Sequence, residues 1–179
     1  MGTAMGTATT YRIFGDVEVD FPDGEVVLGR GVDRCLFGLL VLRVNRAVDI
    51  DTLIHLLWGE QPPRSARKQV TKAVARIRQR TTRSDAAVLT IGARYQFTAD
   101  PLSVDLHRAV HLLGRARYEA SPGVARGLVA QAVALEKGPV LEEFANERVQ
   151  EFIDATVGAD LAALAAAREE LTAAYPAAA

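Results

Sequence analysis

The sequence predicts an α+β domain followed by an all-α segment. Short runs of alternating apolar and polar residues, typical of strands, occur only within the first hundred of the 179 residues. After Asp100-Pro101 the apolar residues recur at helical spacing. Because typical domains hold about 100 to 200 residues, the length allows one full domain and a smaller one. We expect a flexible N-terminus at residues 1–10, a first domain at residues 11–100 and a partial helical domain at residues 104–175.

Two strands are expected at the start of the first domain. The segment 11–21 alternates apolar and polar side chains from Ile13 onwards and is expected to form one strand. Pro22-Asp23-Gly24 is a turn signal, because proline and glycine favour the backbone angles of turns. The apolar residues 26–28 that follow are expected to form the second strand.

Two helices are expected next. Asp33 is the expected N-cap of a helix over residues 34–44, whose wide apolar stripe should place it at the centre of the core. Asp49 is the expected N-cap of a second helix over residues 50–58, and Gly59 should end it.

A third helix, from a Ser65 N-cap to about Thr82, is expected within a basic stretch. Residues 61–84 contain no carboxylate, a pattern typical of a surface that meets a polyanion. Successive residues turn by about 100°, so the helix divides into two faces. The face expected to pack carries Ala66, Val70, Ala73, Val74 and Ile77, and the outward face carries Lys68, Thr71, Lys72, Ala75 and Gln79.

A β-hairpin is expected at the end of the first domain. Residues 88–91 and 95–98 have strand-like composition and flank Gly92-Ala93. Glycine at the first central position is what a tight type II′ turn requires. The order of strands, two helices, a basic helix and a hairpin is that of a winged helix-turn-helix, whose second motif helix enters the DNA major groove.

The remainder of the chain is expected to be all-α and similar to tetratricopeptide repeats. Three helices are expected, at residues 105–119, 124–136 and 147–175, and consecutive antiparallel helices resemble the start of a solenoid. So short a helical domain buries little apolar surface, which favours a homodimer through its helices. The residues expected at that interface are Phe152, Val157, Leu161, Leu164 and Leu171.

Several classes of protein are excluded by what the sequence lacks. No secretory signal and no run of eighteen apolar residues is present, so we expect a cytoplasmic protein with no membrane partner. Cys35 cannot form an intramolecular disulfide and is interpreted as a small buried hydrophobe. His107 and His111 share a helix face without further ligands, so no metal or other cofactor is expected. The sequence also lacks a phosphate-binding glycine loop, a nucleophile elbow and a recognisable carboxylate pair, so no enzyme is expected.

The charge distribution predicts double-stranded DNA as the partner. Residues 1–100 hold 14 basic and 11 acidic side chains, whereas residues 101–179 hold 7 and 11. Base contacts specify a sequence, whereas phosphate contacts fix position and orientation. The candidates for base or groove contacts are Lys68, Thr71 and Lys72, and the candidates for phosphate contacts are Arg64, Arg67, Arg76, Arg78 and Arg94.

Four motifs in this order resemble the Streptomyces antibiotic regulatory proteins. They are residues 53–67 (LIHLLWGEQPPRSAR), 74–78 (VARIR), 104–108 (VDLHR) and 138–141 (GPVL). The resemblance implies an OmpR-like winged helix joined to a bacterial transcriptional activation domain, here truncated. It further implies an activator of secondary-metabolite genes that binds direct repeats and recruits RNA polymerase.

A second interpretation stays open at this point. The family usually has a tyrosine at the position of Ala73 and a serine at that of Ala75, and alanine offers little base-reading chemistry. The alternative is a winged helix that serves as a protein-interaction module, with its basic face docked on an acidic partner.

Overall fold

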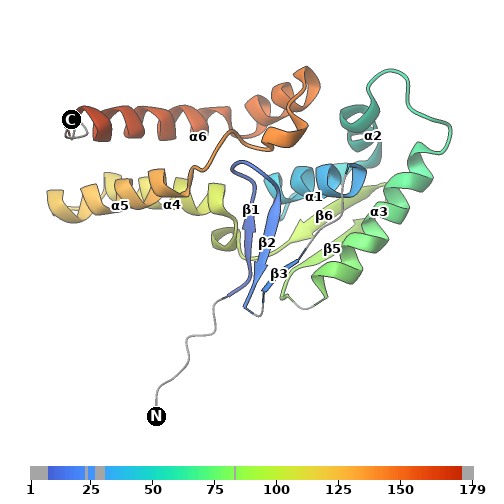
Figure 1. The fold of residues 1–179 in the computed structure, drawn as a ribbon, viewed down its shortest axis with the longest axis horizontal. Helices are drawn as coiled ribbons and strands as arrows, with labels where there is room; N and C mark the ends of the chain where they lie inside the picture. The colour runs from blue at the N-terminus through green and yellow to red at the C-terminus, as the bar shows by residue number, and fades with distance from the viewer. Residues whose placement is uncertain (1–7, 23, 27–30, 83, 175–179) are drawn as a thin grey trace, which may run out of the picture.

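A computed structural model describes residues 8–22, 24–26, 31–82 and 84–174 (Figure 1). Two three-stranded antiparallel sheets and three helices form the N-terminal part, and three further helices form the C-terminal part. The expectations for Asp23, Val27, Leu28 and Tyr175, and for the flexible residues 1–7, fall outside the described residues.

The first sheet consists of β1 (Thr10–Arg12), β2 (Glu18–Phe21) and β3 (Gly24–Val26), with Tyr11 opposite Val19. The prediction of one strand over residues 11–21 is wrong, because the chain turns between β1 and β2 at Gly15, where φ is 80°. The amides of the turn bond to the C-terminal part of the chain, which accounts for the break in the strand.

The helices of the first domain are α1 (Val32–Leu42), α2 (Ile50–Trp58) and α3 (Ala66–Thr81). Gly31 is the N-cap of α1, so the prediction of Asp33 as the cap is wrong. Asp49 and Ser65 do occupy N-cap positions, but neither side chain accepts a capping hydrogen bond. Gly59 ends α2 as predicted, with a φ of 68° that L-residues rarely adopt.

The predicted hairpin is confirmed by the second sheet. Its strands are β4 (Val48–Asp49), β5 (Ala87–Ile91) and β6 (Arg94–Thr98), in the order β4-β6-β5. Ile91 lies opposite Arg94, so the loop has two residues, and Gly92 has a positive φ of 59°. The β5–β6 hairpin, which we call the wing, is therefore the tight turn that glycine at this position predicts.

The C-terminal part contains α4 (Asp105–Arg117), α5 (Pro122–Leu135) and α6 (Glu147–Ala174), with short 3-10 turns at Pro101–Ser103 and Glu142–Phe144. The three helices pack against one another on the side of the first domain away from α3 (Figure 1). Val157 and Leu164 of the predicted dimer stripe are 5% and 1% exposed. These two side chains are already buried within the chain and so are not free for a second copy.

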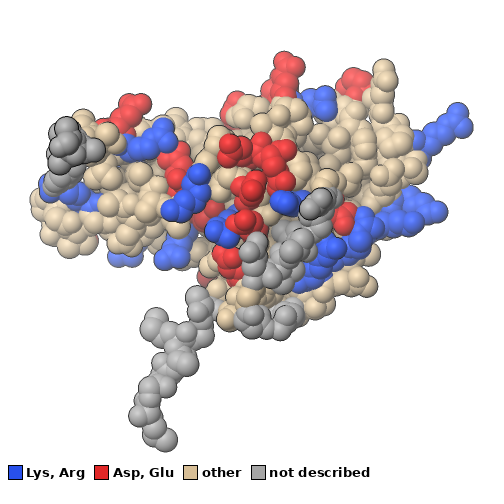
Figure 2. All heavy atoms as spheres, in the orientation of Figure 1, with Lys and Arg blue, Asp and Glu red and all other residues tan. Residues whose placement is uncertain are grey.

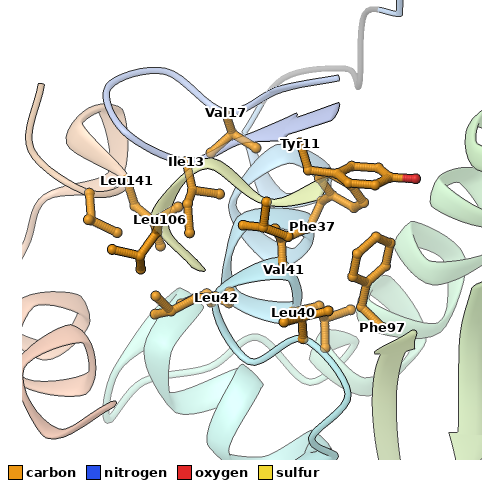
Figure 3. Packing of buried hydrophobic residues seen from close by; sticks show 14 of the residues in the cluster. Tyr11, Ile13, Val17, Phe37, Leu40, Val41, Leu42, Phe97, Leu106 and Leu141 are labelled. Atoms are coloured by element: carbon orange, nitrogen blue, oxygen red, sulfur yellow. The ribbon is translucent and has the colours of Figure 1, made fainter. Parts of the chain in front are cut away.

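One continuous hydrophobic core joins the two parts of the chain (Figure 3). The rings of Tyr11 and Phe37 meet the ring of Phe97 edge to face, with centroid distances of 5.0 and 5.4 Å. Leu106 and Leu141 bring the helical part into the same cluster, and both are fully buried.

Cys35 lies inside α1 as the predicted buried hydrophobe. Its side chain is 6% exposed, and burial, with a smaller contribution from Glu143, raises the pKa of the thiol to about 12. The thiol is therefore protonated at neutral pH, and it is not a nucleophile.

Candidate nucleic-acid interface

Helix α3 has the two faces that its spacing predicts. The five residues expected to pack are all buried, with Val70 and Ile77 completely so. The five residues expected to face outward are all exposed. Because α3 packs on α1, α2 and β5, its outward face is held by the core of the domain.

The outward face of α3 is positively charged. The helix contains no acidic residue, and its basic side chains form a band along it at the lower right of Figure 2. Asp and Glu side chains gather instead over the middle of the same view. The fold thus separates a cationic helix from the acidic surface beside it.

Lys68 and Lys72 are the least constrained charges of this face. Among the described residues, neither ammonium group has a hydrogen-bond or ion-pair partner. Thr71 lies between them, and its hydroxyl donates to the Arg67 carbonyl at 3.0 Å and lies 3.5 Å from the Tyr95 hydroxyl. The structure therefore brings all three candidates for base contacts onto one exposed surface.

Three candidates for phosphate contacts pair with carboxylates of the same chain. Arg67 contacts Asp51 of α2 at 2.6 Å, and Arg94 lies 3.6 Å from Asp49. Arg76 makes a two-pronged contact with Asp33 of α1, with both hydrogen bonds at 2.5 Å. The hydrogen bonds to Asp33 raise the pKa of Arg76, so this guanidinium stays charged.

The other two candidates for phosphate contacts differ from each other. Arg64, in the loop before α3, is exposed and has no partner among the described residues. Arg78 donates from Nε to the carbonyl of Val88 and from Nη2 to the hydroxyl of Thr90, both at 2.8 Å. Arg78 therefore connects α3 to the wing.

The carboxylates opposite these arginines were missed by the sequence interpretation. Asp33 precedes Arg76 by 43 residues, and Asp51 precedes Arg67 by 16. The sequence predicts Asp33 only as an N-cap, and it indicates Asp51 only as an acidic residue near the positive end of a helix, where negative charge is favoured. Their role at α3 depends on the packing of α1 and α2 against it.

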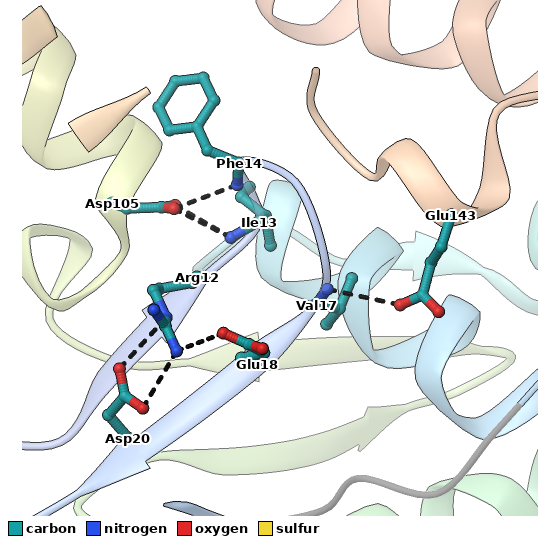
Figure 4. A network of polar contacts seen from close by, with 8 residues as sticks. All are labelled: Arg12, Ile13, Phe14, Val17, Glu18, Asp20, Asp105 and Glu143. Carbon is teal, nitrogen blue, oxygen red and sulfur yellow. Dashed lines mark hydrogen bonds and ion pairs between the residues drawn. The ribbon is translucent and has the colours of Figure 1, made fainter. Parts of the chain in front are cut away.

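A second polar network lies where the helical part meets the first sheet (Figure 4). The buried carboxylate of Asp105 accepts hydrogen bonds from the backbone amides of Ile13, Phe14 and Leu106 at 2.7–3.1 Å. Burial raises the pKa of Asp105, and the amide hydrogen bonds oppose that shift. Asp105 therefore joins α4 to the turn after β1.

The imidazole of His107 contacts the protein backbone. Its Nε2 lies 3.3 Å from the carbonyl of Leu42, and burial lowers the pKa of its imidazole. Within the described part of the chain, no group of three or more His, Cys, Asp or Glu side chains could hold a metal ion. None of the helices in that part is long and apolar enough to cross a membrane.

A basic helix packed on two others, followed by a β-hairpin and a set of antiparallel helices, is a winged helix joined to a helical segment. The solved structure of Mycobacterium tuberculosis EmbR, in complex with a low-affinity phosphopeptide, has the same fold. The TM-score is 0.77 at 23% identity, and the match covers 93% of this chain and 47% of that one.

Relatives by sequence are transcriptional regulators. The chain is 27% identical to RedD of Streptomyces coelicolor over 145 residues and 28% identical to M. tuberculosis EmbR over 159, covering 76% and 82% of this chain. It is 31% identical to AfsR of S. coelicolor over 138 residues, 75% of this chain. The chain spans only 41% of RedD, 40% of EmbR and 14% of AfsR. No family model matches the sequence.

These relatives confirm the resemblance to the Streptomyces antibiotic regulatory proteins. The resemblance spans the winged helix and the helical segment, because each match covers at least three quarters of this chain.

Proposed function

We propose that this protein is a sequence-specific DNA-binding transcriptional regulator. Residues 11–100 bind duplex DNA, and residues 104–175 form part of an effector domain. The observation that carries the proposal is the outward face of α3, which is cationic, free of carboxylates and rigidly supported by the core.

The dimensions of α3 suit a DNA groove. Sixteen residues give a helix of about 24 Å, and the major groove is about 12 Å wide, enough to admit one helix. Thr71 and Lys72 follow Lys68 by three and four residues, so the three side chains share one face of the helix. From that face they reach neighbouring base pairs. Lysine can donate to the O6 and N7 acceptors of guanine, and threonine can contact several bases.

The arginines around α3 supply the contacts with DNA phosphates in this proposal. Arg64 is available without rearrangement. Arg67, Arg76 and Arg94 would exchange an aspartate for a phosphate, and their exposed side chains make that exchange possible. The aspartates compete with DNA and so lower nonspecific affinity, which favours sites where base contacts add to binding.

The biological role follows from the resemblance and the relatives. We infer a cytoplasmic activator that binds direct repeats upstream of secondary-metabolite genes and recruits RNA polymerase. RedD and AfsR, both from Streptomyces coelicolor, are named as regulators, which supports this role.

The test is selection of duplexes from a random library by the full chain, followed by affinity measurements on a selected and a scrambled duplex. We expect the wild-type protein to prefer the selected duplex, and Thr71→Ala and Lys72→Ala to reduce that preference. Arg115→Ala, which removes an exposed cation of α4, is the control and should change neither affinity. Failure to enrich any sequence would favour the alternative of a module that docks on an acidic protein.

A further inference from the structure

We propose that Arg78 is a positioning residue that fixes the wing against α3, and that it does not bind a DNA phosphate. The inference rests on the proposed DNA-binding function, because the wing matters as a second contact with the duplex. It reassigns one of the five phosphate candidates that the sequence suggested.

Both side-chain hydrogen bonds of Arg78 go to one strand. Its Nε and Nη2 donate to the Val88 carbonyl and the Thr90 hydroxyl, both at 2.8 Å. Both acceptors belong to β5, an edge strand of the sheet. A guanidinium holds its donors in a rigid fork, so two hydrogen bonds to residues two apart fix both the position and the direction of that strand.

Apolar packing holds the outer part of β5 only weakly. Val88 is 4% exposed and anchors β5 in the core. Beyond it, Leu89 and Ile91 are each 44% exposed, so few apolar contacts orient the strand toward its turn. Of the two hydrogen bonds from Arg78 to β5, the one to Thr90 lies nearer the turn. It therefore restrains the outer part of β5, whereas β6 and the turn are held by β4 and by the Ile50–Ala93 hydrogen bond.

One of the two donor pairs of Arg78 is already engaged. Two-pronged recognition of an oxyanion by arginine uses two parallel N–H groups, and β5 occupies the side-on pair of Arg78, Nε–H and one Nη2–H. Lys68 and Lys72, on the same helix, have no partner among the described residues and can meet DNA at no such cost. The geometry therefore separates Lys68 and Lys72, which are free to meet DNA, from Arg78, which fixes the wing.

Three substitutions separate geometry from charge. In Arg78→Gln the amide Nε2 takes the same place along the side chain as the Arg Nε, so it keeps a donor for Val88 and loses the charge. In Arg78→Lys the charge stays and the fork is lost. Thr90→Val removes one acceptor from the wing and leaves every cation in place.

The first measurement is amide hydrogen exchange over residues 87–98 in the full chain without DNA. We expect exchange to become about two- to tenfold faster for each hydrogen bond lost, in Arg78→Ala and in Thr90→Val. Arg78→Gln should restore part of the protection. Unchanged exchange in Arg78→Ala would overturn the proposal, and this result does not depend on whether the protein binds DNA.

The second measurement is the salt dependence of binding to a duplex, with Lys68→Ala as the reference for a lost contact. Each phosphate contact contributes about 0.9 to the slope of log affinity against log salt concentration. We expect Arg78→Gln to keep the wild-type slope and to bind the duplex more tightly than Arg78→Ala does. Thr90→Val should bind more weakly than the wild type, with an unchanged slope. A slope reduced by about 0.9 in Arg78→Gln but kept in Arg78→Lys would show a phosphate contact and overturn the assignment. Absence of DNA binding in the wild type would reject the proposed function and leave the exchange result to decide the role of Arg78.

Discussion

Asp105 shows how a single side chain holds two parts of the chain together. Its carboxylate is 7% exposed and accepts hydrogen bonds from three backbone amides, two of them more than ninety residues away in sequence. Without those donors a buried carboxylate would be costly, and without the carboxylate the amides would lack partners. The carboxylate and the amides therefore satisfy each other, so a substitution at Asp105 leaves the amides without suitable partners.

We expect Asp105→Asn to lower the free energy of unfolding by about 1–3 kcal/mol, because its amide group would place an N–H donor against a backbone N–H donor. Urea unfolding of the full chain measures the effect. Asp100→Asn is the matched control, since exposed Asp100 accepts one amide hydrogen bond through one oxygen, which asparagine retains. Equal losses in the two variants would contradict this role.

The role of Asp105 was not predictable from local sequence. The motif at residues 104–108 marked the position, but its donors lie 91 and 92 residues earlier. The same holds for Arg76 and Asp33, which are 43 residues apart. Helical periodicity and turn signals report neighbours in the chain, and they carry no information about such pairs.

At the scale of elements, the sequence predicted the features that depend on residues close together in the chain. The two faces of α3 follow from the helical period, and the wing follows from the glycine at position 92. The turn at Gly15 was missed, because apolar side chains on both sides of it continue the alternation of a strand. The turn is stabilised by partners distant in the sequence, including the Pro139 carbonyl, which accepts from the Gly15 amide at 2.9 Å, and the carboxylate of Asp105.

Helix α1 approaches its neighbours closely at Gly38. An added Cβ there would lie 2.6 Å from Leu141 Cδ2 and 2.9 Å from Val17 Cγ2, and both side chains are buried. In contrast, a Cβ at Gly127 of α5 would meet nothing within 4 Å. The two glycines therefore share a helical backbone and differ in the space around them.

We expect Gly127→Ala to raise the free energy of unfolding by about 0.5–1 kcal/mol, because alanine is the better helix former. Gly38→Ala should lower it by about 1–3 kcal/mol, because overpacking outweighs that gain. Thermal or urea unfolding of both variants provides the comparison. Stabilisation by both substitutions would mean that the contact of α1 with Val17 and Leu141 is looser than described.

At the scale of the whole molecule, the two parts of the chain share a core and a hydrogen-bonded seam. Tyr11 forms a bridge to Val104, and the Leu141 amide donates to the Ile13 carbonyl at 2.9 Å. The boundary expected near Asp100 coincides with the end of β6, but the hydrophobic cluster continues across it. A change in the helical segment can therefore reach the winged helix through direct contacts.

One surface of the molecule is proposed to meet DNA. In our account it is the outward face of α3, where Lys68 and Lys72 have no partner among the described residues. The helical segment lies on the side of the winged helix away from α3 (Figure 1), so in our account it makes no contact with DNA. Cations on the two surfaces should therefore respond differently to salt.

The most direct test is the salt dependence of duplex binding by the full chain, by Lys68→Ala and by Arg115→Ala. We predict a steep fall in wild-type affinity with salt, a slope smaller by about 0.9 in Lys68→Ala, and the wild-type slope in Arg115→Ala. Salt-independent binding, or an equal change in slope for both variants, would contradict the assignment of α3 as the DNA-binding surface.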